Sequence, residues 1–216
     1  METKDIDFSK QYFEVKNKYK NHILFYRLGD FYEMFFDDAI IASRELELTL
    51  TGRDCGLEER APMCGVPHHA CDVYLKKLIE KGYNVAICEQ TMDPAMCKGI
   101  VPREVIRVVT PGTLIESSML DETSNNYICA FYMRAKESAL CLADISTGEV
   151  HLFEFEGKEM TSSAINELSR FSPAEILIND AFLSNKELSS FIREKLKTSV
   201  QLLEENDFSP DIQKRC

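Results

Sequence analysis

A carboxylate stands between two aromatic residues at one point of this sequence. Phe31, Glu33 and Phe35 alternate within a stretch that carries five aromatic side chains between Tyr26 and Phe36. In an extended chain, residues two apart share a face. Burying a lone charge on that face is costly unless the charge is paired or protonated. The pattern predicts a surface face, or a special partner for Glu33; the alternative is a core phenylalanine beside a surface glutamate.

Four side chains that could bind zinc lie within eight residues. They are Cys64, His68, His69 and Cys71. Structural zinc sites use four such ligands, but at other spacings, and two adjacent histidines rarely both bind one ion. The sequence therefore predicts no metal site here.

Asp144 ends an apolar segment and precedes the turn formers Ser146–Gly148, with Glu149 close by. In ribonuclease-H-like nucleases a carboxylate in such a place binds catalytic Mg²⁺. A two-metal site needs several converging carboxylates, and a turn-capping aspartate is the competing interpretation. A Mg²⁺-dependent nuclease using Asp144 is thus the alternative function, and the cap is the expected role.

The elements that must position these residues alternate between strands and helices, which indicates an α/β protein. An amphipathic helix is expected over 7–20, followed by two aromatic strands on either side of the turn signal Gly29-Asp30. Asp37-Asp38 favours a helix start. Residues 52–60 are expected to form a surface loop. The turn-rich segment 111–126 separates this half from a second set of strands and helices.

Charge and length restrict the function further. The chain has 216 residues and a formal net charge of −11. A self-sufficient DNA-binding protein usually has a basic surface, so any DNA affinity must come from a local patch. Residues 1–20 are too charged for a signal peptide, and no apolar run could span a bilayer. The protein is expected to be cytoplasmic, with its eight cysteines reduced.

Four blocks of the sequence, in this order, resemble blocks of one known family. They are Gly29–Glu33, Pro62–Ala70, Val85–Gln90 and Arg107–Thr113. The first, Gly-Asp-Phe-Tyr-Glu, resembles the mismatch-recognition motif of the MutS family of DNA mismatch-repair proteins. The resemblance covers residues 20–115 and, more loosely, 126–156. Four ordered blocks are specific, whereas Phe-x-Glu alone is not.

The resemblance implies two domains. Residues 1–115 would form the mixed-sheet mismatch-recognition domain, 116–125 a linker, and 126–216 a ribonuclease-H-like α/β connector domain that is truncated at its C-terminus. We therefore expect an amino-terminal fragment whose task is binding rather than catalysis. No Gly-x4-Gly-Lys-Ser/Thr motif occurs in the sequence, so ATP and Mg²⁺ are expected in the full-length parent, a DNA-dependent ATPase, and no cofactor in this part.

The resemblance also implies roles for particular residues. Phe31 would wedge into the DNA minor groove and stack on a mispaired base, and Glu33 would hydrogen-bond that base. Contacts with the DNA backbone are expected from Arg53, which matches a family position, and from Lys98, Arg103, Arg107 and Thr110; a solvated surface charge is the alternative for each cation. The expected partners are mismatched double-stranded DNA, a second copy of the full-length parent, and a downstream repair factor bound through the connector domain.

Overall fold

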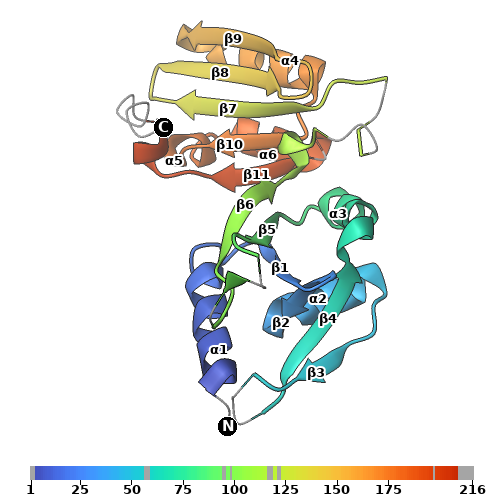
Figure 1. Cartoon of the computed structure of the whole chain (residues 1–216). Coiled ribbons are helices and arrows are strands. Elements are labelled where there is room, and N and C mark those ends of the chain that lie inside the picture. Colours follow the sequence, from blue (N-terminus) through green and yellow to red (C-terminus); the bar gives the residue numbers. More distant parts are fainter. Residues whose placement is uncertain are drawn as a thin grey trace. The chain divides into compact units, whose positions relative to one another are not determined.

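A computed structural model describes residues 3–55, 59–93, 96–97, 99–115, 119–120, 123–196 and 198–208. The chain divides into two compact units, Met1–Thr110 and Pro111–Cys216. Each unit is built around one mixed sheet with helices, as Figure 1 shows. The predicted α/β fold class is confirmed. None of the described helices is long and apolar enough to cross a membrane.

In the residues that the structure describes, the first unit forms a six-stranded sheet in the order β3-β4-β2-β1-β5-β6. Only β1 and β5 pair in parallel, and the other neighbours are antiparallel. The elements, in chain order, are α1 (Thr3–Lys16), β1 (Ile23–Leu28), β2 (Phe31–Phe35), α2 (Phe36–Leu46), β3 (Thr51–Arg53), β4 (Ala61–Pro67), the short 3-10 turn His68–Ala70, α3 (Cys71–Glu80), β5 (Val85–Gln90) and β6 (Arg103–Val109).

Helices cover both faces of this first sheet. On one face, the rings of Phe8 and Tyr12 from α1 pack 5.4 and 5.3 Å from the ring of Phe35. On the other face, the Cys64 thiol donates to the Ala39 carbonyl of α2 at 3.5 Å. Because successive side chains of a strand point to opposite faces, Phe31 and Glu33 share the face that α1 covers at Phe35.

Strand β4 is an element that the sequence did not predict. It carries Pro62, Gly65 and Pro67, which are unfavourable in a strand with neighbours on both sides. The structure resolves this conflict through register. Pro62 pairs with β3 before the pairing with β2 begins, and Pro67 pairs with β2 after β3 has ended. Each proline therefore has a strand neighbour on one side only.

Over its described residues, the second unit forms a five-stranded sheet in the order β11-β10-β7-β8-β9. Strands β7, β8 and β9 form an antiparallel meander, and β10 and β11 add in parallel to β7, as expected for a ribonuclease-H-like unit. The elements are the 3-10 turn Pro111–Thr113, β7 (Tyr127–Met133), β8 (Glu137–Asp144), β9 (Glu149–Glu156), a turn at Gly157–Glu159, α4 (Met160–Phe171), β10 (Glu175–Ile178), α5 (Asp180–Leu183), α6 (Lys186–Lys195), β11 (Ser199–Leu202) and a turn at Glu205–Phe208.

The segment Pro111–Thr113 belongs to the second unit because Gly112 is held inside it. The Gly112 amide donates to Glu175 Oε2 at 3.1 Å. A Cβ at this position would lie 2.8 Å from the Cβ of Ile128, so only glycine allows the approach. The domain limits 1–115 and 126–216 remain predictions, and of the linker 116–125, residues 116–118 and 121–122 lie outside the described part.

Candidate nucleic-acid interface

The turn between β1 and β2 places Phe31 at the end of a strand. Gly29 adopts a φ of +58°, a conformation that favours glycine. The turn pairs Phe31 with Leu28 on one side, and β4 offers Pro67 on the other. The side chain of Phe31 is 47% exposed, whereas Phe35, on the same face of β2, is fully buried. The face thus runs from the core to the surface, and the Phe31 ring is available for stacking.

Glu33 lies between these two phenylalanines and has a charged partner. Its Oε2 accepts a hydrogen bond from Arg53 Nη1 at 2.7 Å, with side-chain exposures of 17% for the glutamate and 39% for the arginine. The residue opposite Glu33 in β4 is Gly65, where a Cβ would approach Glu33 Cγ to 3.4 Å. Of the two alternatives that the sequence left for Glu33, a surface face or a special partner, the structure provides a partner, Arg53.

Arg53 reaches Glu33 from the edge strand β3 and contacts the first helix as well. Its guanidinium lies 5.2 Å from the centre of the Phe8 ring, within the range of a cation–π interaction. The cation is thus placed between an aromatic face and a carboxylate. This arrangement gives Arg53 a defined position beside Glu33 while part of its side chain stays accessible.

The Glu89 carboxylate stabilises the β1–β2 hairpin on the face opposite Phe31, and the sequence analysis did not predict this contact. The Tyr32 hydroxyl donates to the Glu89 carboxylate of β5, and Arg27 Nη1 contacts the same oxygen at 3.2 Å. The Arg27 guanidinium also lies 5.7 Å from the Tyr32 ring centre. Burial, and then Glu89, raise the pKa of Tyr32 above its usual value, so the phenol remains a donor. The available signal was a glutamate directly following the apolar run Val85–Cys88.

Arg103, predicted to contact the DNA backbone, is used inside the first unit. Its Nε donates to the Arg27 carbonyl at 2.8 Å, and its Nη1 donates to Gln11 Oε1 at 3.0 Å and to the Val101 carbonyl at 2.8 Å. Its guanidinium lies 5.1 Å from the Tyr26 ring centre. Arg103 thus connects β6 with β1 and α1, a structural role that the sequence did not suggest.

The other residues predicted to contact the DNA backbone are Thr110, Arg107 and Lys98. Thr110 is buried, with 6% of its surface exposed. Arg107 is half-buried in the edge strand β6, opposite Ile87. Lys98 lies outside the described residues. Of the predicted cations within the described residues, Arg53 is the one that the structure brings to Glu33, and contact of any of these residues with DNA remains a prediction.

Comparison with known proteins identifies the family. The sequence model of MutS domain I matches residues 7–118, and that of MutS domain II matches residues 126–215. The chain belongs to the MutS family.

Individual MutS proteins agree over most of the chain. The DNA mismatch repair protein MutS of Ruminiclostridium cellulolyticum is 51% identical over 199 residues, which are 92% of this chain and 23% of that protein. The one from Acetivibrio thermocellus is 49% identical over 202 residues, 94% of this chain and 23% of that protein. The one from Clostridium tetani is 49% identical over 92% of this chain and 22% of its own length. The chain thus spans less than a quarter of these MutS relatives.

Within the MutS domain II region, Asp144 is bound by donors of its own neighbourhood. Its Oδ1 accepts from the Ser146 amide at 2.9 Å, the Ser146 hydroxyl at 2.6 Å and the Thr147 amide at 3.3 Å, and its Oδ2 accepts from the Asn126 amide at 3.1 Å. Burial alone would raise the pKa of Asp144, but these hydrogen bonds bring it below the usual range. The described residues contain no cluster of carboxylates suited to a metal. The nuclease alternative therefore finds no support.

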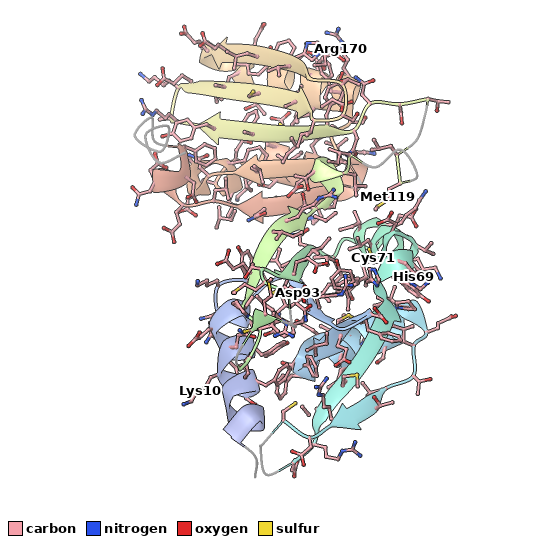
Figure 2. All side chains as sticks on the ribbon, viewed as in Figure 1. Lys10, His69, Cys71, Asp93, Met119 and Arg170 are labelled. Carbon is pink, nitrogen blue, oxygen red and sulfur yellow. The ribbon has the colours of Figure 1, made fainter. Side chains whose placement is uncertain are left out.

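The four possible zinc ligands of the MutS domain I region differ in their burial and in their contacts. Cys64 is buried, and burial raises the pKa of its thiol to about 12. His68 Nδ1 lies 3.1 Å from the Asp30 carbonyl, at the turn that precedes Phe31. His69 and Cys71, labelled in Figure 2, lie where β4 leads into α3. No set of three or more possible metal ligands gathers among the residues described.

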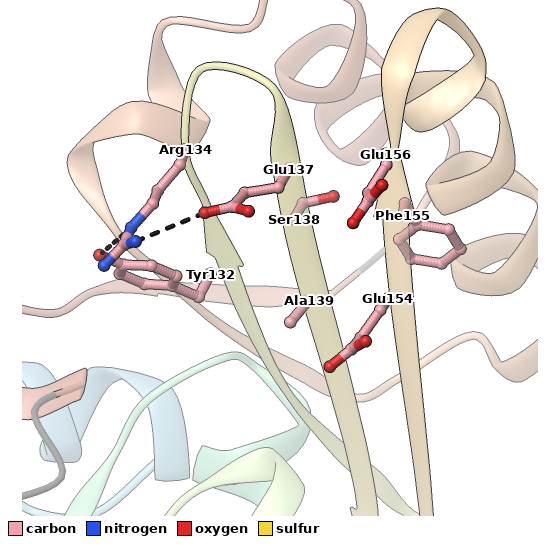
Figure 3. A pocket seen from close by; sticks show the side chains of 8 residues that line it. All are labelled: Tyr132, Arg134, Glu137, Ser138, Ala139, Glu154, Phe155 and Glu156. Carbon is pink, nitrogen blue, oxygen red and sulfur yellow. Dashed lines mark hydrogen bonds and ion pairs between the residues drawn. The ribbon is translucent and has the colours of Figure 1, made fainter.

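The second unit also carries a pocket, seen from close by in Figure 3. Its volume is about 290 Å³, and it is lined by Tyr132, Arg134, Glu137, Ser138, Ala139, Glu154, Phe155 and Glu156. Arg134 and Glu137 are paired at 3.4 Å. Because three carboxylates face one guanidinium, this pocket repels a polyanion, and it lies at the opposite end of β8 from Asp144.

Proposed function

We propose that the first unit of this chain binds mismatched or unpaired bases in duplex DNA, as part of DNA mismatch repair. The observation that carries the proposal is the exposed Phe31 ring at the end of β2, beside Glu33 on the same face. Membership of the MutS family and the relatives' name, DNA mismatch repair protein, support it.

Phe31 would enter the minor groove and stack on the mispaired base. A wedge of this kind partly unstacks a base step and kinks the duplex. Stacking a base on an aromatic ring is worth about 1–3 kcal/mol and works for every base. A mismatched or unpaired base costs less to unstack than a paired one, so selectivity comes from the deformability of the DNA.

Glu33 would hydrogen-bond the base on which Phe31 stacks. A protonated Glu33 can donate to a base nitrogen, and an ionised one can accept from a base N–H. Arg53 and the half-buried Arg107 would fix the register on the backbone without reading sequence, and Lys98, Arg103 and Thr110 are the further proposed contacts.

The remaining steps of repair are proposed for the full-length protein. The relatives are more than four times as long as the part that this chain matches. We assign ATP and Mg²⁺ binding, pairing with a second copy, and signalling to a downstream repair factor through the second unit to that whole protein. Its DNA-dependent ATPase activity would convert recognition into signalling.

A gel-shift series tests the proposal. This chain and the full-length protein are compared on a homoduplex and on the same duplex with one unpaired base. We expect a clear preference for the unpaired base in the full-length protein, and weak, salt-sensitive binding by this chain because its net charge is −11. If the full-length protein binds both duplexes with equal affinity, the proposal is refuted. Mg²⁺-dependent cleavage of the DNA by this chain would favour the nuclease alternative.

A further inference from the structure

The two residues that we assign to the base and to the backbone are bound to each other. Glu33 Oε2 and Arg53 Nη1 form an ion pair at 2.7 Å. In the proposed function, the same carboxylate must reach a base and the same guanidinium must reach a phosphate. While the pair is closed, the Nη1 hydrogen and the Oε2 lone pair that join the two side chains are used between them and not for DNA.

We propose that the Glu33–Arg53 ion pair is a latch that opens when the protein binds a mismatch. In the free protein, Arg53 holds the carboxylate of Glu33 and neutralises its charge. On a mismatch, Arg53 turns to a phosphate and Glu33 turns to the base beside Phe31. Arg53 is therefore a positioning residue for Glu33, a role that rests on the proposed function and goes beyond a simple backbone contact.

The geometry of Arg53 suits a latch. Its side chain is 39% exposed, so a phosphate can approach it, and a guanidinium carries five N–H donors that match two phosphate oxygens. The Phe8 ring, 5.2 Å away, stabilises the cation whether or not Glu33 holds it. The guanidinium can therefore exchange one anion for another with little loss of its own surroundings.

The geometry of Glu33 suits the other half of the exchange. Its side chain is 17% exposed and lies on the face of β2 that leads to Phe31. Gly65 opposite leaves the space that a side chain would fill, since a Cβ there would touch Glu33 Cγ at 3.4 Å. Glu33 can turn within this space without displacing the core residues of this face, which include Tyr26 opposite it in β1 and Phe35 in β2.

A double-mutant cycle tests the latch, using Glu33→Gln, Arg53→Gln and the double variant. In thermal unfolding of this chain, the two changes should couple, because the pair exists in the free protein. In the full-length protein on mismatched DNA, Arg53→Gln should weaken binding less when Glu33 is present than in the Glu33→Gln background. The reason is that binding must open the pair only when both residues are present. The expected difference is about two- to fivefold in affinity, the range of partly exposed ion pairs.

A matched control is available in the same unit. Lys81 Nζ and Glu45 Oε2 form an ion pair at 2.9 Å with exposures of 47% and 18%, close to those of the latch. The cycle of Lys81→Gln and Glu45→Gln should show coupling in unfolding and none in mismatch binding. The latch is overturned if Arg53→Gln weakens mismatch binding equally in both backgrounds, or more when Glu33 is present. If the cycle gives this overturning result while Phe31→Ala still abolishes mismatch preference in the same assay, the latch alone is refuted. If Phe31→Ala keeps the preference, the proposed function itself fails, and the latch with it.

Discussion

Two carboxylates near hairpin turns, Glu33 in the first unit and Asp144 in the second, are held in opposite ways. Asp144 is 1% exposed and accepts four hydrogen bonds, three of them from Ser146 and Thr147 just beyond it. Glu33 is partly exposed and is held by Arg53, a flexible side chain that comes from another strand, 20 residues along the chain. Both are acidic groups on strands, yet they differ in exposure and in the kind of group that holds them. Both differences affect how easily the carboxylate can leave its partner.

The difference separates a structural carboxylate from one that can change partners. Backbone amides next to Asp144 move only if the turn itself unfolds, so its hydrogen bonds last as long as the fold. A guanidinium on a long side chain can leave Glu33 without any change in the sheet. An acidic residue that a distant cation holds at the surface is therefore the better candidate for ligand contact.

The largest effect is expected from Phe31→Ala, which tests whether the Glu33 face is a binding surface at all. In the full-length protein, the change should reduce mismatch preference by about 5- to 150-fold, the value of one stacked base. The melting temperature should barely change because the ring is half exposed. The control is Phe35→Ala, which removes a fully buried ring from the same strand and should cost about 3–5 kcal/mol of stability. If Phe31→Ala keeps the preference while its melting temperature collapses, Phe31 is a core residue.

A smaller effect, on stability alone, is expected from Asp144→Asn. An amide cannot accept all four hydrogen bonds, so the unfolding free energy at neutral pH should fall by about 1–3 kcal/mol. Because folding lowers the pKa of Asp144, its stabilisation is complete above the unfolded value of about 4 and is lost as the pH falls through the folded value. The gap between wild type and variant should therefore narrow below about pH 4 in urea titrations. A gap that stays constant at acid pH would show that the carboxylate is not the stabilising group.

The smallest effect on DNA binding is expected from Glu33, and it is a change in the discrimination between paired and mismatched DNA. Glu33→Ala removes a negative charge near phosphates and frees Arg53, so affinity for perfectly paired DNA should rise severalfold. Glu33→Gln should keep part of the preference because an amide can still donate to a base nitrogen. Both predictions are checked by measuring the affinities of the two variants for homoduplex and mismatched DNA at one fixed salt concentration. Equal loss of preference in the two variants would show that hydrogen bonding to the base plays no part.

The sequence predicted local features of the site well because they depend on alternation. The two-residue period placed Phe31, Glu33 and Phe35 on one face, and the alternatives of a surface face or a partner for Glu33 followed from the cost of burying a carboxylate. The helix start at Asp37-Asp38 is also confirmed, since both lie in the first turn of α2. These inferences use residues within a few positions of one another.

The partners themselves could not be predicted because they come from distant parts of the chain. Arg53 was expected in a surface loop, whereas it ends β3 and reaches across β4. Strand β4 lies between Arg53 on β3 and Glu33 on β2. The sequence did not indicate this strand because it contains two prolines, which a strand tolerates only in a suitable register. Arg103 looked like a surface cation because its acceptors on Arg27, Gln11 and Val101 converge only after folding.

The contacts of Tyr32 and Arg27 with Glu89, on the face opposite Phe31, affect the order in which the chain folds. Tyr32 and Arg27 leave the ribosome together, but the Glu89 carboxylate that joins them lies 62 residues after Arg27. β1 also pairs with β5 in parallel, and such long-range pairing forms more slowly than a local hairpin. The hairpin that carries Phe31 can therefore form early during synthesis, but it becomes rigid only when most of the first unit has been made.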